Sequence, residues 1–537
     1  MAKKRTRRPA KPAPATPAPA TPAVAANKPA ADKPAATKPA ADKRDPKSAT
    51  NKTGPYKLPA PEQPAFWFGF EVAWAKLAIG RVVLFGMLAL DALLQIRHAP
   101  RYGAGGFNVA QIPLLDALGP TRASYAVAEL LNAWLFTLAA FGVATRWVLP
   151  AAAAIYGWLY FGSQLDSYQH HYLVSMLLLL ACFVPWQRPP DGAPRVRTWA
   201  LRLMLVELGI MYLWAAISKM NGAWTNGTTL ATQIIGPMRH MIDATVGIAF
   251  ASKLVILVEL SLAALVWQPR FAAIIAPLGL AFHVGILFSG LEIGLFAWLM
   301  IAIYLFVIPD RVYDALVRVL ATPLGAWRVI AAWFDGALGW FVWLVGIVLA
   351  LVFAMLTRFE YAGRIGVLLL VVTIAGTVVS IVRAPTARRM TAIGLAHLAA
   401  FTLWLATDRS STVAVDYYRF WGGTSRRLGD LAASERAYRE LIAVAPYEPT
   451  GHMQLGRLLL NQGKSDEGLA ELHEAEHVAP SDPRAYVVEA RWLATHGNLD
   501  DALIKAKDAT YADPNDKSAR DLLDKLSRGG APPAETP

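Results

Sequence analysis

The sequence predicts an all-α membrane protein: a polytopic transmembrane bundle of about eleven helices, followed by a soluble α-solenoid of tetratricopeptide repeats. Three observations predict this fold class. The 537 residues are 55% hydrophobic and only 17% charged, which is less charge than a soluble protein of this length carries. Apolar runs long enough to cross a bilayer recur between residues 66 and 407. A 34-residue period then organises residues 415–528.

Residues 1–62 form a basic, low-complexity tail rich in proline, alanine and lysine, which is predicted to be disordered because it cannot bury a core. Residues 1–60 hold 14 Lys and Arg against three Asp, so most of the net charge of +13 lies here. We expect the tail to attract anionic lipid headgroups. The alternatives are nucleic-acid or partner binding by the tail. No nucleic acid is expected as a partner of the folded chain, because the rest of the sequence is nearly neutral.

The membrane region divides into residues 66–310 and additional helices over 311–407. The predicted spans cover 74–95, 123–144, 147–163, 170–186, 198–218, 249–266, 271–288, 292–308, 338–357, 361–382 and 389–407. With the tail in the cytoplasm, most arginines between spans fall in inner loops, as the positive-inside rule requires. An odd number of spans then places the repeat domain outside, on the periplasmic side of a bacterial inner membrane.

The repeat domain contains three rows of residues with one spacing of 34. The rows are Pro446, Pro480 and Pro514; Gly429, Gly463 and Gly497; and Gly422, Gly456 and Ala490. In a tetratricopeptide repeat a small residue lets two helices cross closely, a glycine ends the first helix, and a proline starts the next repeat. Three repeats and a cap helix at 516–528 predict a groove that binds a peptide or protein. The alternative is a module that only packs against the membrane domain.

Four ionisable residues lie at the outer ends of predicted spans. His170 and His171 begin the fourth span, Lys219 ends the fifth, and His283 lies toward the outer end of the seventh. Ionisable residues within spans are functional candidates because their burial is costly. Their common depth predicts a shared, outward-facing pocket. The alternatives are a lysine that interacts with the helix dipole and reaches for water, and histidines that only hydrogen-bond neighbouring helices.

Metal and nucleotide sites are not expected, because no HxxxH, CxxC, GxxxxGK[ST] or strand-linked GxGxxG pattern occurs. Aromatic residues near the outer face are candidates to line a pocket for a quinone-like ligand: Tyr168, Tyr172, Tyr212, Trp214 and Trp224. The remaining ionisable residues of the spans are interpreted as structural ion pairs or interface residues: Arg81, Asp91, Glu129, Arg202, Glu207 and Glu259.

Three segments, in this order, resemble the HTTM family, the membrane domain of vitamin K-dependent γ-carboxylases and their bacterial relatives. HHYL at 170–173 is similar to the family's His-x-Tyr-Leu segment. SKMNGAWTNG at 218–227 resembles its Lys-Leu-Asp-x-x-Trp-x-x-Gly segment, and FHVGILFSGLEIGLF at 282–296 resembles its Phe-His and Ile-Gly-x-Phe segment. The resemblance covers about residues 70–310.

The resemblance implies a chemistry. In the carboxylases a lysine deprotonates reduced vitamin K, the anion reacts with O₂, and the strong base so formed removes a γ-proton from a peptidyl glutamate that then adds CO₂. Lys219 matches that lysine, His170 matches the histidine that supports the oxygenated intermediate, and His283 matches a further polar residue of the cavity. Reduced vitamin K or another quinol is the implied cofactor, with O₂ and CO₂ as co-substrates.

Two main functions follow. The first is a quinol-dependent, γ-glutamyl carboxylase-like enzyme that acts on a peptide or protein presented by the repeats. The second is a non-enzymatic, membrane-anchored scaffold whose repeats recruit an envelope protein. A transporter is the weakest alternative, because no inverted repeat or pair of broken helices is apparent.

Overall fold

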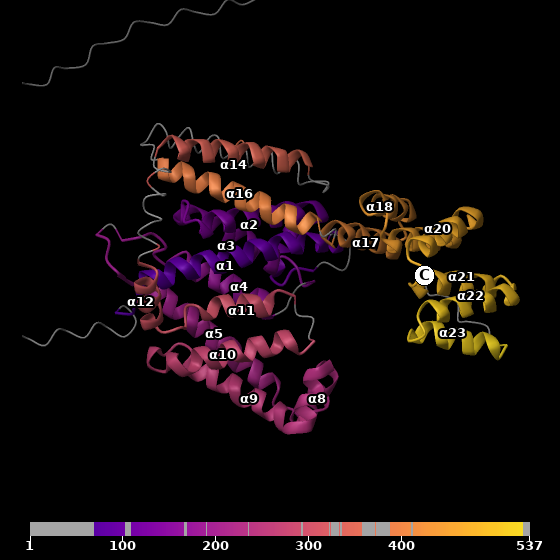
Figure 1. Ribbon diagram of the computed structural model, residues 1–537, viewed down its shortest axis with the longest axis horizontal. Coiled ribbons are helices and arrows are strands. Elements are labelled where there is room, and N and C mark those ends of the chain that lie inside the picture. Colours follow the sequence, from indigo (N-terminus) through magenta and orange to yellow (C-terminus); the bar gives the residue numbers. More distant parts are fainter. Residues whose placement is uncertain are drawn as a thin grey trace, which may run out of the picture. The chain divides into compact units, whose positions relative to one another are not determined.

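The computed structural model describes residues 69–529, apart from 103–108, 166–168, 190, 235, 291–293, most of 322–335, most of 357–386, and 410–411. The described chain is almost entirely helical (Figure 1). The basic tail, Tyr168 and nearly all of the span expected at 361–382 lie outside the described residues.

The apolar bundle comprises the described elements between residues 71 and 409. In chain order these are β1 (Glu71–Ala73), α1 (Trp74–Gln95), η1 (Ile96–Arg101), η2 (Pro113–Leu118), α2 (Arg122–Ala140), α3 (Thr145–Phe161), α4 (Gln169–Ala181), β2 (Arg195–Arg197), α5 (Trp199–Ser218), α6 (Gly222–Thr225), α7 (Thr228–Gln233), α8 (Gly236–Thr245), α9 (Ile248–Leu265), η3 (Pro269–Phe271), α10 (Ala272–Phe288), α11 (Phe296–Tyr304), α12 (Asp310–Val319), α14 (Ala337–Leu356) and α16 (Ala387–Arg409).

Five of the described helical segments are long and apolar enough to cross a membrane, which indicates membrane association. They are Trp74–Arg101, Arg122–Ala140, Trp199–Ser218, Ile248–Leu265 and Pro269–Phe288. Two expected spans are shorter as helices: α4 has 13 residues and α11 has nine, whereas α3 has 17, as many as the span expected there. The expected count of eleven is therefore not confirmed.

A small antiparallel sheet, absent from the all-α expectation, fixes one end of the bundle. β1 pairs with β2, with Val72 opposite Val196. Asp310, the first residue of α12, joins the same end: its carboxylate accepts a hydrogen bond from the Ala73 amide at 3.0 Å and forms an ion pair with Lys76 at 2.6 Å. These polar contacts bring together three segments that are far apart in sequence.

The sheet also sets the direction of two long helices. α1 starts directly after β1, and α5 starts two residues after β2. Since both helices begin at the sheet and both are candidates to cross the membrane, their C-terminal ends lie on the same side of the bundle. That side therefore carries η1 and Lys219.

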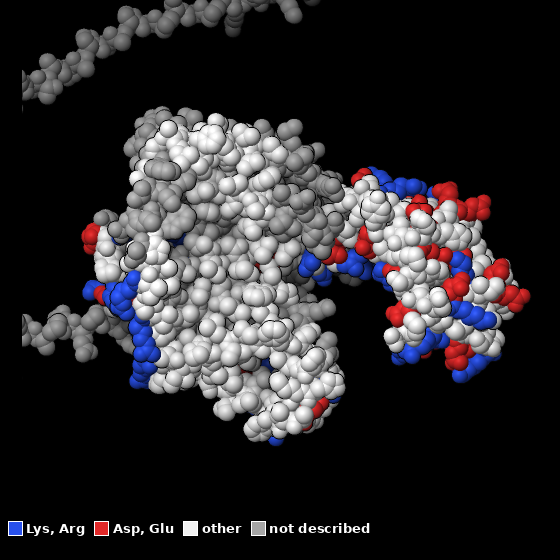
Figure 2. Space-filling view, viewed as in Figure 1, with Lys and Arg blue, Asp and Glu red and all other residues white. Residues whose placement is uncertain are grey.

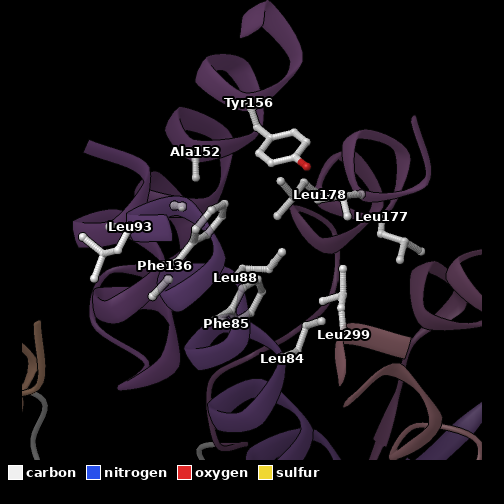
Figure 3. Close-up of a cluster of buried hydrophobic side chains, with 14 of the residues drawn as sticks. Leu84, Phe85, Leu88, Leu93, Phe136, Ala152, Tyr156, Leu177, Leu178 and Leu299 are labelled. Carbon is white, nitrogen blue, oxygen red and sulfur yellow. The ribbon is translucent and has the colours of Figure 1, made fainter. Parts of the chain in front are cut away.

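Apolar side chains from α1, α2, α3, α4 and α11 fill the centre of the bundle (Figure 3). Phe85 of α1 stacks on Phe136 of α2, with ring centroids 6.4 Å apart, and meets the edge of Trp186 at 5.4 Å. Gly80 of α1 lets α1 approach Phe306, because a Cβ at this position would overlap the Phe306 ring. Such close packing holds the helices that carry the site.

Residues 412–527 form a second set of helices, which we call the paired helices. They are α17 (Thr412–Arg427), α18 (Leu431–Val444), α19 (Pro449–Asn461), α20 (Ser465–Val478), α21 (Pro483–Thr495), α22 (Leu499–Ala512) and α23 (Lys517–Ser527). α17 packs on α18, α19 on α20 and α21 on α22, and α23 packs on the last pair.

The glycine rows have the local roles that the 34-residue spacing suggests. Gly429, Gly463 and Gly497 have φ of 78°, 79° and 82°, a left-handed backbone that favours glycine where the first helix of each pair ends. Gly456 of α19 faces the Gly468 carbonyl of α20, where a Cβ would approach the oxygen to 2.8 Å. The period thus produces three similar helix pairs.

The paired helices are seated on the bundle through α17. Arg97 of η1 lies 3.4 Å from Asp416, and the Arg122 guanidinium lies 4.0 Å above the Trp421 ring. One buried apolar cluster continues from the bundle through Tyr417 and Tyr438 into the first pairs. Because η1 belongs to this contact, the paired helices adjoin the side of the bundle that carries Lys219.

Candidate active site

Lys219 occupies the position immediately after α5, where its backbone amide still closes the last helical turn. Asn221 then starts a new short helix, since its Oδ1 accepts a hydrogen bond from the Trp224 amide at 3.0 Å. This turn brings the Trp224 ring to 5.4 Å from the Lys219 ammonium. The Trp224 Nε1 donates to the Ser252 carbonyl of α9 at 3.2 Å, which fixes the ring between α5 and α9.

The ammonium group of Lys219 forms an ion pair with Glu259 of α9. Nζ lies 2.8 Å from Glu259 Oε1 and 3.1 Å from the Ala215 carbonyl. The Glu259 side chain is 6% exposed and the Lys219 side chain 22%. The sequence predicts only a structural ion pair or an interface role for Glu259. The structure pairs it with Lys219, the candidate base. The Lys219 side chain is therefore mostly covered by protein and does not extend into solvent.

His283 belongs to a hydrogen-bonded chain with two tyrosines. The Tyr304 hydroxyl of α11 donates to the Tyr212 oxygen of α5 at 3.1 Å, and Tyr212 Oη lies 2.6 Å from His283 Nε2 of α10. In the arrangement in which Tyr304 donates to Tyr212, Tyr212 donates to His283 Nε2, and the ring proton of a neutral His283 lies on Nδ1. All three side chains are buried.

The ion pair and the tyrosine–histidine chain each include a residue of α5 or of its C-terminal end. Tyr212 and Lys219 are seven residues apart, so they lie on one face of the helix about two turns from each other. Glu259 also interacts electrostatically with Tyr212. The structure shows no direct contact between Lys219 and His283 among the described residues, and α5 is the element that the two groups share.

Two polar atoms of this site have no hydrogen-bond partner among the described residues: Glu259 Oε2 and His283 Nδ1. One is an acceptor and the other, in the tautomer above, is a donor. Buried polar atoms are usually satisfied, so each of these two atoms is a candidate contact for a polar ligand. A quinol offers a hydroxyl to donate and an oxygen to accept, and therefore fits these two atoms chemically.

An apolar cleft of about 410 Å³ adjoins the same helices. Its lining comes from α5 and α9, together with Trp267, and consists of Val206, Gly209, Ile210, Leu213, Leu260, Ala263, Ala264 and Trp267. The cleft offers apolar surface to the hydrocarbon tail of a lipid-soluble ligand, between the helix that ends at Lys219 and the helix that carries Glu259.

His170 lies in a second cluster. Its ring is 4.2 Å from that of His171 and 5.2 Å from that of Phe296, and His171 Nδ1 lies 2.7 Å from the Tyr156 hydroxyl. The contacts of His170 with His171 and Phe296 do not test the expected pocket shared with Lys219 and His283. That pocket and the catalytic role of His170 stay predictions.

The four aromatic candidates that lie within the described residues differ in position. Tyr212 and Trp224 are buried within the Lys219 site, whereas Tyr172 is 41% exposed and Trp214 61% exposed on the outside of the described bundle. Tyr172 interacts with Glu207. Only Tyr212 and Trp224 are placed to shape the polar site directly.

One cluster of metal-ligating residue types occurs among the described residues, in the paired helices: His473, Glu476 and Glu489. Lys505 Nζ lies 2.9 Å from a carboxylate oxygen of both glutamates. The Lys505 ammonium group thus occupies the place of a cation beside these carboxylates.

An enclosed lysine–glutamate pair and a tyrosine–histidine chain within apolar helices define a membrane-associated protein with a buried polar site. Comparison with known families matches residues 71–310 to the HTTM domain. This match relates the segment to the vitamin K-dependent γ-carboxylase-like membrane proteins. A search of curated proteins finds no match.

Sequence reasoning did not single out Glu259 or Tyr304 as site residues. Glu259 is 40 residues from Lys219, and Tyr304 is 92 residues from Tyr212. A carboxylate in an otherwise apolar helix is a signal that a cation must be near. It does not reveal which cation, because the pairing depends on how α5 packs against α9.

Proposed function

We propose that residues 71–310 form a quinol-dependent, γ-carboxylase-like enzyme in which Lys219 and Glu259 together accept a proton from the quinol. The observation that carries the proposal is the ion pair between Lys219 Nζ and Glu259 Oε1, with Glu259 Oε2 enclosed and unsatisfied. The carboxylate of this ion pair can accept one further proton, and its free oxygen Oε2 is the atom placed to do so.

A bound quinol would supply an acidic hydroxyl and two electrons for reaction with O₂. Uptake of its proton leaves Lys219 as the ammonium ion and Glu259 as the neutral acid. The site then gains one positive charge at the moment when the ligand becomes an anion. Trp224 and the apolar walls of α5 and α9 limit the access of water, which strengthens this electrostatic attraction.

The tyrosine–histidine chain would hold the ligand oxygen. In the proposed tautomer His283 Nδ1 donates a hydrogen bond, while Tyr212 and Tyr304 fix the ring and its protonation. The histidine pair at His170 would act as a second polar group on the same side. CO₂ would be the second co-substrate if the base formed by this chemistry acts on a peptidyl glutamate.

The paired helices are interpreted as tetratricopeptide repeats that present a peptide or protein substrate. Their seat on η1 supports this role, because η1 and Lys219 lie on one side of the bundle. We place this side in the periplasm of a bacterial cell and the basic tail at the anionic cytoplasmic surface of the inner membrane.

A non-enzymatic scaffold is the second candidate. It is favoured by the charged, groove-bearing paired helices, which would recruit a partner without any reaction at Lys219. The two functions differ in what they require of the lysine. The scaffold tolerates its loss, whereas the enzyme does not.

The deciding experiment measures epoxide formation from reduced vitamin K or a reduced menaquinone by the purified protein with O₂. Wild type should form epoxide, and Lys219→Ala should lose at least about a hundredfold in rate, as expected for loss of a general base. Lys253→Ala is the matched control, since Lys253 is exposed on the same α9 helix that carries Glu259. Absence of epoxide with every quinol, or equal rates for the Lys219 and Lys253 variants, would refute the enzyme.

A further inference from the structure

Two adjoining clefts along the paired helices carry an excess of arginine. One, of about 540 Å³, lies among the end of η1, α17 and α19, with Tyr438 of α18; the other, of about 210 Å³, lies among α19, α21 and α23. Gln454 lines both clefts, so they form one continuous surface, which we call the arginine groove. Its charged lining residues are Arg101, Arg419, Arg426, Arg427, Arg457, Arg484, Arg491 and Asp516. Figure 2 shows basic side chains gathered where the paired helices meet the apolar bundle.

Two arginines of the groove pair with carboxylates that are close to them in sequence. Arg419 pairs with Asp416 at 2.7 Å, and Arg484 pairs with Asp482 at 2.5 Å. Arg426 differs, because its Nε and Nη1 are enclosed and have no hydrogen-bond partner among the described residues. Enclosed N–H groups without acceptors are costly, and negatively charged oxygens satisfy guanidinium N–H groups with the strongest hydrogen bonds. Arg426 therefore indicates an anionic ligand.

The groove repeats this chemistry along its length. Arg457 and Arg491 are 34 residues apart and thus occupy the same place in successive helix pairs. Apolar side chains of Met453, Val487 and Val488 lie between the charged positions. A ladder of cations separated by apolar surface matches an extended polypeptide with acidic residues at intervals. A lipid headgroup would engage only the end beside η1 and would leave the cations on α21 unused.

We propose that the arginine groove binds an extended, glutamate- or aspartate-rich segment of a partner polypeptide. The binding itself needs no catalysis. Only the identification of the bound segment as a substrate rests on the proposed function. A glutamate-rich chain held in the groove adjoins the side of the bundle that carries Lys219. The proposal thus assigns an acidic polypeptide as the substrate class.

The test is fluorescence anisotropy with full-length protein in a non-ionic detergent. The probes are a fluorescein-labelled 12-residue peptide with glutamate at every third position and its twin with glutamine at those positions. We expect the glutamate peptide to bind at least about tenfold more tightly than its twin, and to weaken as salt is added. The double variant Arg426→Gln/Arg427→Gln should weaken the glutamate peptide by about tenfold or more.

The matched control is Arg436→Gln/Lys507→Gln, which removes two exposed cations from α18 and α22, the second helices of their pairs. It should leave binding within about twofold of wild type, as surface charges outside a site contribute little. Helical circular dichroism should be equal for both variants, which separates lost binding from lost folding.

Equal affinity for the two peptides, or equal loss in both double variants, would overturn the proposal. Binding of phosphatidylglycerol vesicles that depends on Arg426 and Arg427, without peptide binding, would overturn it in favour of a lipid. A wild type that binds the peptide but forms no epoxide would keep the groove and refute only the enzyme, so the two failures are distinguishable.

Discussion

The apolar bundle and the paired helices place their charges in opposite ways. The face of the bundle seen in Figure 2 is mostly uncharged, with Lys and Arg gathered along its left edge, whereas the paired helices display Lys, Arg, Asp and Glu over their surface. Within the bundle, ionisable groups such as Glu259 and His283 are buried and bonded to particular partners. In the paired helices, alanine and leucine fill the interior and charges form pairs or a groove at the surface.

This difference shows how the same secondary structure serves two solvents. A helix in a bilayer must hide each charge, so a hidden charge there indicates chemistry or a specific partner. A helix in water displays charge at little cost, so only a local excess of one sign is informative. The ion pair of Lys219 and the arginine groove are the corresponding signals in the two regions.

The largest expected effect comes from closing the gap between α10 and α11. Gly279→Ala would place a methyl group on the Tyr304 ring and displace it from Tyr212. We expect a loss of about 2–3 kcal/mol in the free energy of unfolding, measured as a lower midpoint of thermal unfolding in detergent. Gly285→Ala on the same helix meets nothing within 4 Å and should not lower the midpoint. Equal midpoints for both variants would contradict the close contact.

In the paired helices the corresponding change should have a smaller effect. Gly456→Ala brings a Cβ to 2.8 Å from the Gly468 carbonyl and 2.9 Å from Leu472, so we expect a loss of about 1–2 kcal/mol. Gly423→Ala on α17 meets nothing within 4 Å and should raise stability slightly, since alanine favours helix. The urea midpoint can be followed by a dye on Tyr511→Cys in a Cys182→Ser background. A Gly456→Ala protein as stable as Gly423→Ala would show that these helices do not cross closely.

The smallest expected effect is a pH dependence of the paired helices. Burial raises the pKa of Glu476 to about 7, with Glu489 adding to the rise and the Lys505 ammonium opposing it. Between pH 4.5 and 7 the folded state keeps a proton that the unfolded state releases, so the free energy of unfolding falls as pH rises through this window. Glu476→Gln should remove that part of the fall in urea midpoint, whereas Glu474→Gln, at an exposed position, should keep it. Parallel pH profiles for wild type and Glu476→Gln would contradict the raised pKa.

Much of the fold could be predicted from local pattern. The 34-residue rows anticipate the three helix pairs, because each left-handed glycine is a purely local requirement. The apolar runs anticipate helices, but not their length: α4 and α11 are short where polar or turn-forming residues interrupt a run that remains apolar on average. The β1–β2 ladder joins three-residue segments more than 120 positions apart, and so short a pairing has no periodic signal.

The site was only partly predictable for the same reason. Lys219, Tyr212, Trp224 and His283 are recognisable from sequence because each is polar or aromatic at a helix end or within an apolar run. Their connections are tertiary. The Lys219–Glu259 pair and the contact of His170 with Phe296 follow from helix packing, which no spacing within one segment encodes.

The most direct test of the account is a double-mutant cycle on the rate of quinol epoxidation, with Lys219→Ala, Glu259→Gln and the combined variant. If lysine and glutamate accept the proton as one unit, each single variant should lose at least about a hundredfold and the combined variant should lose little more. A Glu259→Gln protein with wild-type rate, or losses that multiply in the combined variant, would contradict the claim that the pair is the base.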